Sequence, residues 1–291
     1  MDKKRILKEL KYALRFLPDK VYIQLYYFAA FKKLCNLKSP QTYNEKLNWL
    51  KLYDHNPLYT KLVDKFEVKS YVAEIIGEEY VIPTLSVVGT DFDEIDFDNL
   101  PNQFVIKCTH DSEGLVIVKD KGKLNKEAVK KKIAKALDFN FYYIGREWPY
   151  KDVKPRIIVE EYLEDHTDGE LRDYKFFCFD GEPKAMFIAS DRAKGNTKFD
   201  YFDLKFNHLN IRQHYPNAKE VRKPINFEKM IELSRKLSKG FPHVRVDFYE
   251  VDGRIYFGEL TFYHFSGFQP FIPNKWDKIF GDWLKLPSIK M

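Results

Sequence analysis

Short β-strand patterns separated by glycine-containing turns occupy most of the second half of the sequence. Their apolar residues alternate with polar ones or form short continuous runs, as in half-buried and fully buried strands. The strand segments are 156–162, 173–179, 184–189, 243–251 and 254–262, with one helical pattern at 227–237. Strands of this kind pair into a sheet whose apolar side chains must be buried in a core. This requirement constrains the fold more than any other feature of the sequence.

The first half is mainly helical. Apolar residues recur every three to four positions up to Pro18, which breaks the pattern, and a second helix is predicted from residue 21 to about 34. Thr42 and Glu45 have the spacing of a capping box, which predicts a helix through Trp49 and Leu52. Further predicted elements are helices over 62–76 and 126–137 and strands at 80–82, 104–108 and 115–119.

Composition excludes several classes of protein. The most apolar stretch, 21–31, is about half of the ~20 residues that a membrane span needs. The N-terminus lacks the apolar core of a signal peptide, so we expect a cytoplasmic protein. The three cysteines show no CxxC spacing, and the seven histidines show no zinc-ligand spacing. A net charge of +6 favours anionic partners without choosing among them.

One predicted strand pair carries acidic side chains among apolar residues. Segments 243–251 and 254–262 flank Asp252-Gly253, which predicts a β-hairpin. Carboxylates from neighbouring strands, here Asp247 and Glu259, suit a hard cation such as Mg2+, whose coordination a nucleotide's phosphates would complete. The alternative is an ordinary amphipathic strand pair with polar side chains facing water.

The register of this hairpin decides whether the two acids meet. A strict two-residue loop pairs Asp247 with Gly258 and turns Glu259 to the other face of the sheet. A one-residue bulge places Asp247 opposite Glu259. The sequence is compatible with both registers.

A strand that ends in lysine and a small-residue loop form a candidate phosphate site. Segment 104–107 ends in Lys107, and the loop 108–114 leads into the next strand. Backbone N–H groups of such a loop, together with a lysine, can face a polyphosphate. The single glycine of this loop, Gly114, makes the pattern weak by itself.

Acidic residues on two other strands are further candidates. Glu160 and Glu161 end an apolar strand, which suits either adenine binding or a strand end that reaches solvent. Asp173 and Lys175 share one strand face, where they can meet a ribose hydroxyl or a phosphate, or form a cross-strand ion pair.

Taken in order, these segments resemble the ATP-grasp superfamily, and the chain is similar to its TupA-like branch, associated with teichuronopeptide and capsular polysaccharide synthesis. The resemblance covers about residues 35–290. It is carried by the order and spacing of SPQTYNEKL at 39–47, VDK at 63–65, Gly77, Pro83-Thr84, DYKFF at 173–177 and GELTF at 258–262. The implied fold is α+β, with helical residues 1–60, an N-terminal ATP-grasp subdomain at 61–102, a mobile lid at 103–164 and a metal- and nucleotide-binding subdomain at 165–291.

The resemblance also implies roles for individual residues in nucleotide binding. Lys65 and Lys107 match lysines that contact ATP phosphates, and Ser112 lies in the matching lid loop. The adenine-binding hinge matches Glu160, Glu161 and Leu163.

Residues of the second half complete the implied site. Asp173 falls where a ribose-binding acid is expected, and Asp247 and Glu259 match the Mg2+ ligands. Thr261 stands where many members carry an asparagine ligand. Arg245 matches a basic residue that faces an acyl phosphate, and Arg245 and Lys175 are the predicted catalytic residues.

The implied reaction uses ATP and Mg2+ to activate a carboxylate, which an amine then attacks to form an amide. For this branch, the carboxylate would belong to an acidic sugar or amino acid of a capsular or cell-wall polysaccharide. The expected partners are these two substrates and no nucleic acid. Contact of the basic, aromatic N-terminal helices with a membrane or a lipid-linked glycan stays open, as does the oligomeric state.

Three alternatives remain at this point. A sugar kinase would keep the fold and transfer phosphate to a hydroxyl. A glycosyltransferase would use the acidic pair for a nucleotide sugar, but Lys65 and Lys107 would then lack a role. A non-catalytic glycan- or nucleic-acid-binding protein would use exposed aromatics as stacking platforms.

Overall fold

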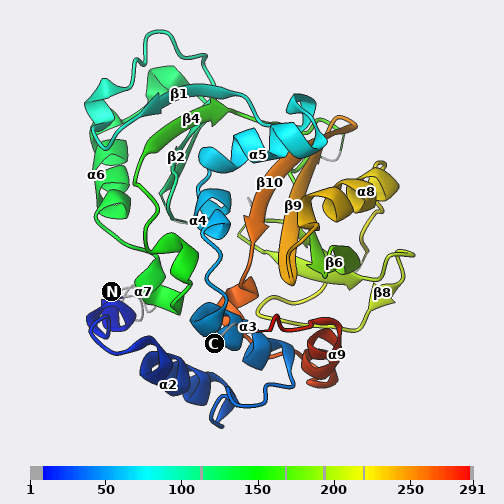
Figure 1. The fold of residues 1–291 in the computed structure, drawn as a ribbon. Coiled ribbons are helices and arrows are strands. Elements are labelled where there is room, and N and C mark those ends of the chain that lie inside the picture. The colour runs from blue at the N-terminus through cyan, green and yellow to red at the C-terminus, as the bar shows by residue number, and fades with distance from the viewer. Residues whose placement is uncertain (1–8, 112–113, 168, 193–194, 219, 289–291) are drawn as a thin grey trace. The chain divides into compact units, whose positions relative to one another are not determined.

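The computed structural model describes residues 9–111, 114–167, 169–192, 195–218 and 220–288 (Figure 1). The chain divides into two compact units. The first combines Met1–Asn56 with Asp165–Met291, and the second is Pro57–Glu164. Each contains one antiparallel sheet and several helices, which confirms the predicted α+β class. The finer division into four parts stays a prediction.

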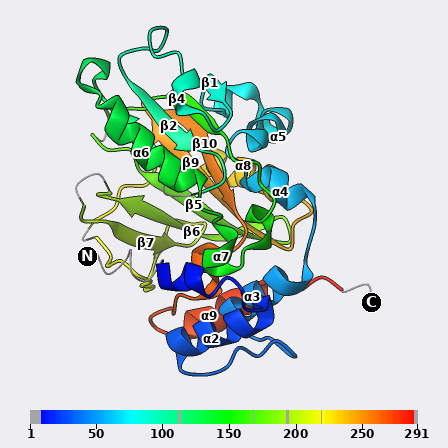
Figure 2. The same ribbon diagram turned by 90° about the vertical axis from the view of Figure 1, so that its left-hand side faces the viewer.

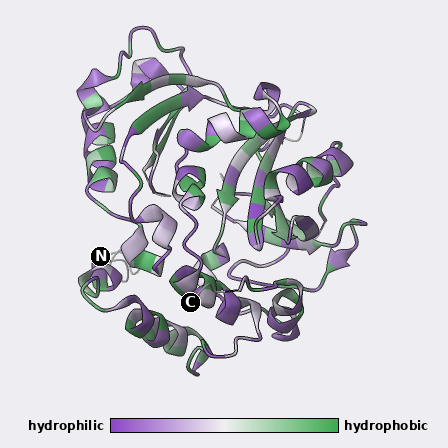
Figure 3. Cartoon of the chain, in the orientation of Figure 1, coloured by the Kyte–Doolittle hydropathy of each residue, from purple (hydrophilic) through white to green (hydrophobic). Residues whose placement is uncertain are grey.

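The sheet of the first unit has the strand order β10-β9-β5-β6-β7-β8. Its strands are β5 (Asp173–Phe179), β6 (Glu182–Ser190), β7 (Lys198–Phe202), β8 (His208–Leu209), β9 (His243–Val251) and β10 (Arg254–Thr261). Every pairing is antiparallel. Hydrophobic segments run along the strands of both sheets, as the green colour shows in Figure 3.

Helix α8 (Phe227–Ser238) packs on one face of this sheet (Figure 1). Phe176 of β5 meets Phe227 of α8 at a ring distance of 6.0 Å and Phe248 of β9 at 6.1 Å. Because strand side chains alternate between faces, the odd-numbered residues of β5 and β9 point away from α8. The candidate site residues of these strands are all odd-numbered.

Part of the opposite face is closed by α3 (Tyr43–Tyr53) and α9 (Lys275–Trp283). Phe177 of β5 packs against Tyr43 and Phe280, with ring distances of 6.4 and 5.1 Å. Helix α2 (Asp19–Phe31) lies beside these helices in both views (Figures 1 and 2). Arg245 pairs with Phe177 at the border of this aromatic cluster, and the polar residues Lys175 and Asp247 follow it on the same face.

The capping box predicted at Thr42 is confirmed. The side-chain oxygen of Thr42 accepts from the N–H of Glu45 at 3.4 Å. In return, the carboxylate of Glu45 accepts from the N–H of Thr42 at 3.2 Å. Both bonds satisfy N–H groups that the first turn of α3 would otherwise leave unpaired.

The second unit contains a four-stranded sheet of order β1-β4-β2-β3. Its elements are β1 (Thr84–Val88), β2 (Phe104–Cys108), β3 (Leu115–Val118), β4 (Ile157–Glu161), α4 (Leu58–Val63), α5 (Glu67–Ile76), α6 (Lys126–Leu137) and α7 (Tyr142–Gly145). One face packs on α6, where Ile133 is buried with Phe104 and Ile106. The other face carries Lys107 and Glu160, as the strand alternation requires.

Two sequence predictions in this unit were wrong. The helix expected over 62–76 is two helices, because the Asp64 carboxylate accepts from the N–H groups of Phe66 and Glu67 at 2.8 and 3.1 Å and starts a new helix there. The strand expected at 80–82 is preceded by a 3-10 turn and begins only at Thr84. Pro83, which has no N–H to donate, separates the apolar residues from the strand.

Among the described residues, no helix has the length and hydrophobicity needed to cross a bilayer. The three cysteines are free and buried. The cytoplasmic location remains a prediction.

Candidate functional site

Asp247 and Glu259 lie directly opposite each other on β9 and β10. The register of the hairpin shifts between Phe257 and Glu259, so that a bulge at Gly258 replaces the strict pairing. A Cβ at Gly258 would lie 3.1 Å from the backbone oxygen of Asp247, so a residue without a side chain fits best here. Of the two registers that the sequence allowed, the structure has the one that brings the acids together.

Arg245 joins the two acids. It precedes Asp247 by two positions and therefore points to the same face of β9. Its Nη2 lies 2.7 Å from Oδ2 of Asp247 and 2.8 Å from Oε1 of Glu259, and its Nε lies 2.7 Å from Oδ1 of Asp247. Because both carboxylates accept hydrogen bonds from one guanidinium, their oxygens lie close together on the same face of the sheet.

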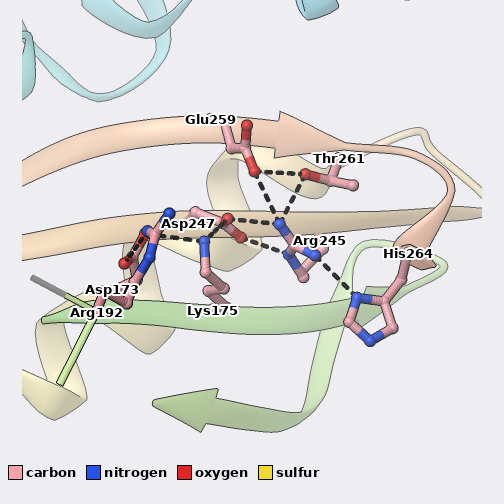
Figure 4. A network of polar contacts seen from close by, with 8 residues as sticks. All are labelled: Asp173, Lys175, Arg192, Arg245, Asp247, Glu259, Thr261 and His264. Atoms are coloured by element: carbon pink, nitrogen blue, oxygen red, sulfur yellow. Dashed lines mark hydrogen bonds and ion pairs between the residues drawn. The ribbon is translucent and has the colours of Figure 1, made fainter. Parts of the chain in front are cut away.

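Residues of β5 extend this cluster into a network of alternating charges (Figure 4). Lys175, which pairs with Asp247 in the register of β5 and β9, contacts the Asp247 carboxylate and lies 3.0 Å from that of Asp173. Arg192 contacts the other oxygen of Asp173. The cross-strand ion pair considered from the sequence is therefore present, and it belongs to a larger network.

Burial and charge pairing set the ionisation of this network. Burial alone would lower the pKa of Lys175, but Asp173 and Asp247 outweigh it, and the pKa lies above the ordinary value. Burial likewise opposes ionisation of Asp173, yet Lys175 and Arg192 hold its pKa below the ordinary value. Burial raises the pKa of Asp247 against the opposing effect of Arg245 and Lys175. Three N–H donors on its oxygens stabilise the charged form, so we treat this carboxylate as ionised.

His264 hydrogen-bonds the guanidinium of Arg245 through the nitrogen that does not contact the carboxylates. Nη1 of Arg245 lies 2.8 Å from Nδ1 of His264, and Nε2 of His264 lies 3.1 Å from Oε1 of Gln213. An arginine only donates, so Nδ1 accepts and Nε2 carries the proton. Burial first, and then the charge of Arg245, hold the pKa of His264 well below its ordinary value. The histidine is therefore neutral and acts as a hydrogen-bond relay.

The donor set fits Mg2+ only together with further oxygens. No group of three or more His, Cys, Asp and Glu side chains suited to hold a metal occurs among the described residues. Asp247 and Glu259 supply two carboxylates at one point, and the Glu259 side chain is 45% exposed, so it can accept a ligand from solvent. Thr261 accepts from Arg245 at 2.9 Å and donates to Glu259 at 3.1 Å, which links these residues to each other.

In the second unit, the buried carboxylate of Glu160 contacts two lysines. Lys107 from β2 and Lys69 from α5 each contact one of its oxygens. Burial opposes its ionisation, but the two ammonium groups outweigh this and lower the pKa of Glu160. The Lys69 ammonium also donates to the carbonyl of Ile82 at 2.8 Å. Glu160 thereby fixes the position of Lys107 on the face of the sheet opposite α6.

Lys65 lies at the loop that follows β2. Its N–H donates to the carbonyl of Thr109 at 3.1 Å, and its ammonium donates to the carbonyl of Asp111. The Asp111 carboxylate in turn accepts from the N–H of Gly114 at 2.9 Å. Ser112, the predicted loop contact, falls outside the described residues.

The predicted residues thus form clusters within each unit. The first unit brings together Asp173, Lys175, Arg245, Asp247, Glu259 and Thr261. The second unit joins Lys107 to Glu160 and places Lys65 at the loop after β2. Glu161 is exposed and Leu163 is half-buried, and neither belongs to these clusters.

The sequence reasoning missed Arg192, His264 and Lys69. Nineteen positions separate His264 from Arg245, and no spacing pattern connects them. Lys69 follows Lys65 by four residues, the spacing of neighbours on a helix face, but the helix begins only after Lys65. Arg192 likewise lies nineteen positions from Asp173, so no local pattern in the sequence connects the two.

A family model described as TupA-like ATPgrasp matches residues 45–285. No curated protein matches the sequence. Solved structures with some likeness include D-alanine–D-alanine ligase from Bacillus anthracis in complex with ATP, with 17% identity, a TM-score of 0.39, and coverage of 69% of this chain and 54% of that one.

Two other solved structures show a similar degree of likeness. D-alanine–D-alanine ligase from Helicobacter pylori has 15% identity and a TM-score of 0.43, with 84% of this chain and 69% of that chain covered. The ATP-grasp ligase PsnB, complexed with a minimal precursor, Mg and ADP, has 10% identity and a TM-score of 0.40, with 75% and 57% covered. The chain thus spans about half the length of the first of these structures (54%).

Proposed function

Because the chain belongs to the TupA-like ATP-grasp family, we propose that it is a carboxylate–amine ligase that forms an amide through an acyl phosphate. Family membership confirms the predicted ATP-grasp fold and makes the chain an ATP-grasp enzyme with ATP and Mg2+ as cofactors. The reaction, its substrates and the roles of individual residues are our proposal.

The pairing of Asp247 with Glu259 is the observation that carries the proposal. Two carboxylates converge on one cationic nitrogen of Arg245, and one of them, Glu259, is 45% exposed. Carboxylates in such positions can bind Mg2+ if the nucleotide supplies the remaining oxygens. The bound ion would neutralise charge on the transferred phosphate.

Two cations of the network, Arg245 and Lys175, can stabilise negative charge during formation and attack of the acyl phosphate. Arg245 is held by Asp247 and His264, so its guanidinium is oriented before a substrate arrives. A fixed cation at this point can stabilise the negative charge that develops when an amine attacks an acyl phosphate. Lys175, which is buried and carries a raised pKa, stays charged and can bind a phosphate oxygen or a substrate carboxylate.

The second unit contributes a positioned phosphate-binding cation. Lys107 is tied to Glu160 and lies on the strand that leads into the loop 108–114. We assign Lys107 and Lys65 to the ATP phosphates, with Ser112 at the same loop. Glu161, Leu163 and Asp173 remain the proposed contacts for adenine and ribose.

We further propose that the carboxylate belongs to an acidic sugar or amino acid of a capsular or cell-wall polysaccharide. The net charge of +6 supports an anionic substrate, because it favours the approach of acidic molecules. The amine would come from the same class of precursor.

Trapping the acyl phosphate with hydroxylamine would test the reaction. The protein is incubated with ATP, Mg2+, hydroxylamine and a panel of uronic acids and amino acids, and hydroxamate and ADP are measured. Equal amounts of hydroxamate and ADP with one of the acids are expected. ADP with a phosphorylated sugar and no hydroxamate would instead identify a kinase.

Binding of ATP should be measured first, by calorimetry, with and without Mg2+. Binding that requires Mg2+ and is weakened by Asp247→Asn and by Lys107→Ala is expected. Absence of ATP binding in the wild type would contradict the proposal, and binding of a nucleotide sugar without ATP binding would favour a glycosyltransferase.

A further inference from the structure

Helix α2 presents an apolar side to solvent. Val21, Leu25 and Phe28 are spaced by four and three residues and therefore lie on one side of the helix. Their side chains are 45, 55 and 52% exposed, and Leu34, just beyond the helix, is 67% exposed. With Lys20 and Gln24 they line a shallow apolar depression of about 340 Å³.

The opposite side of α2 is anchored in the first unit. Tyr22, Ile23 and Tyr27 are buried, and the ring of Tyr26 lies 4.1 Å from that of Phe268. The exposed side is therefore held in a defined orientation. It is an ordered surface of the folded protein.

A hydrogen-bonded link fixes Leu34 beside the helix. The side chain of Gln24 accepts from the N–H of Cys35 at 2.8 Å and donates to its carbonyl at 2.9 Å. Because Cys35 is buried, the chain around it is held against α2. The apolar residues of the helix and Leu34 thus form one continuous surface.

Lys20 lines the apolar depression, and other basic residues flank the surface along the chain. Residues 15–34 contain Arg15, Lys20, Lys32 and Lys33 and one acid, Asp19. Lys32 ends the helix in the left-handed conformation and is exposed, as are Arg15 and Lys20. An ordered helix with an apolar side and a basic rim matches the surface of an anionic bilayer, where lysines meet phosphates and apolar side chains enter the interface. Figure 3 shows hydrophobic and hydrophilic residues mixed along α2.

We infer that the α2 surface, formed by Lys20, Val21, Leu25, Phe28, Lys32 and Leu34, attaches the protein reversibly to anionic phospholipid bilayers. The charge of the rim favours this occupant over an uncharged apolar partner, because cations around an apolar patch are costly to bury against a neutral surface. The inference does not depend on the proposed ligase reaction, since none of these residues belongs to the candidate site.

Vesicle sedimentation with the full chain tests the inference. Vesicles of phosphatidylglycerol and phosphatidylcholine are compared with vesicles of phosphatidylcholine alone. The wild type is expected to sediment with the anionic vesicles and to be released by added salt, because screening weakens charge pairing. Equal binding to both kinds of vesicle, or no binding to either, would overturn the inference.

Paired variants assign the binding to α2. The double variant Leu25→Glu, Phe28→Glu should lose at least about tenfold in vesicle affinity. The two carboxylates would replace apolar side chains that enter the bilayer interface, and the anionic lipids would repel them. The control, Ile117→Glu with Ile272→Glu, changes two apolar residues that are 53 and 51% exposed elsewhere, and should bind as the wild type does. If the α2 variant bound vesicles unchanged, this surface would not be the attachment site.

Three further measurements separate attachment from other effects. Unchanged thermal unfolding and unchanged Mg2+–ATP binding in the α2 variant would show that the fold and the nucleotide site are intact. Light scattering reports the oligomeric state. A wild-type dimer that becomes a monomer in the α2 variant would assign the surface to a second copy of this chain and contradict the inference.

Discussion

The guanidinium of Arg245 donates a hydrogen bond to Nδ1 of His264 at 2.8 Å. The bond requires a neutral histidine, because a protonated ring has no acceptor to offer. It also leaves the other two nitrogens of the guanidinium for the carboxylates: Nε donates to Asp247, and Nη2 donates to Asp247 and Glu259. His264 therefore helps to orient the proposed catalytic arginine from the side opposite the two carboxylates.

We expect His264→Leu to reduce the maximal rate of hydroxamate formation about tenfold, the lower end of the effect of removing an outer-shell partner. Leucine cannot accept from Arg245, so the guanidinium loses part of its fixed orientation. The Michaelis constant for ATP should change little. His264→Gln, which keeps an acceptor, should restore part of the rate.

A substitution of His208 serves as the control for this prediction. Its ring is 46% exposed and bonds Asp200, away from the network of Arg245. His208→Leu should leave the rate unchanged. Equal rates for the two leucine variants would remove His264 from the positioning of Arg245.

Glu259→Gln should abolish most of the strengthening of ATP binding by Mg2+. The change keeps the side-chain shape, and the half-exposed position should tolerate it, but a neutral amide is a poor ligand for a hard cation. We expect the affinity in Mg2+ to fall at least about tenfold, with little change in its absence. Calorimetry measures both.

Glu182→Gln is the matched control. Glu182 is 49% exposed and, like Glu259, accepts from an arginine, here Arg235. Its loss should leave the dependence on Mg2+ as it is. If Glu259→Gln behaved like this control, Glu259 would not be a ligand.

Gly258→Ala should disturb the bulge that pairs the two acids. A Cβ there would lie 3.1 Å from the backbone oxygen of Asp247 and 3.3 Å from Cε2 of Tyr249, so β9 or β10 must shift. We expect a loss of about 1–2 kcal/mol in the free energy of unfolding by urea and weaker Mg2+-dependent ATP binding. At Gly89 a Cβ has room, with the nearest atom 3.9 Å away, so Gly89→Ala should change neither quantity.

Glu160→Gln should destabilise the protein by about 3 kcal/mol, because it leaves the ammonium groups of Lys69 and Lys107 without their shared charge partner in a buried site. The neighbouring carboxylate of Glu161 is exposed, so Glu161→Gln should have almost no effect. Urea unfolding of both variants decides the matter. Equal stabilities would mean that Glu160 does not hold these lysines in solution.

Stability should fall as the pH is lowered from 6.5 to 5.5. Burial depresses the pKa of His243 from its ordinary value of 6.5 to about 3. Its Nδ1 donates to the carbonyl of Cys178 and its Nε2 accepts from the hydroxyl of Tyr43, each at 2.8 Å, so the folded ring is neutral. Below pH 6.5 the imidazole of His243 binds a proton in the unfolded chain but stays neutral in the folded protein. The free energy of unfolding therefore falls by about 1.4 kcal/mol per pH unit.

His243→Gln should remove this contribution, because glutamine does not titrate. Its amide can still donate to the carbonyl of Cys178. The difference in unfolding free energy between pH 6.5 and 5.5 should therefore be smaller in the variant than in the wild type. An unchanged difference would assign the pH dependence to other groups, such as His264.

Much of the fold could be predicted from local patterns. The period of apolar residues gave β2, β5, β9 and α6 with the bounds that the structure has, and the Thr42–Glu45 spacing gave the start of α3. These features depend on neighbours within a few residues, which a single sequence displays. The break at Asp64 was missed because it depends on one side chain that caps a new helix in the middle of an apolar pattern.

The sequence by itself determined which acids, lysines and arginines were candidates and which strands carry them. Only the tertiary structure decided that a bulge at Gly258 sets Asp247 against Glu259, that Lys107 reaches Glu160, and that His264 supports Arg245. The physical reason is that strand register and long-range hydrogen bonds follow from the packing of whole sheets. The two registers of the hairpin are equally compatible with the local sequence. They differ in which side chains each face of the sheet buries, and that difference exists only in the folded chain.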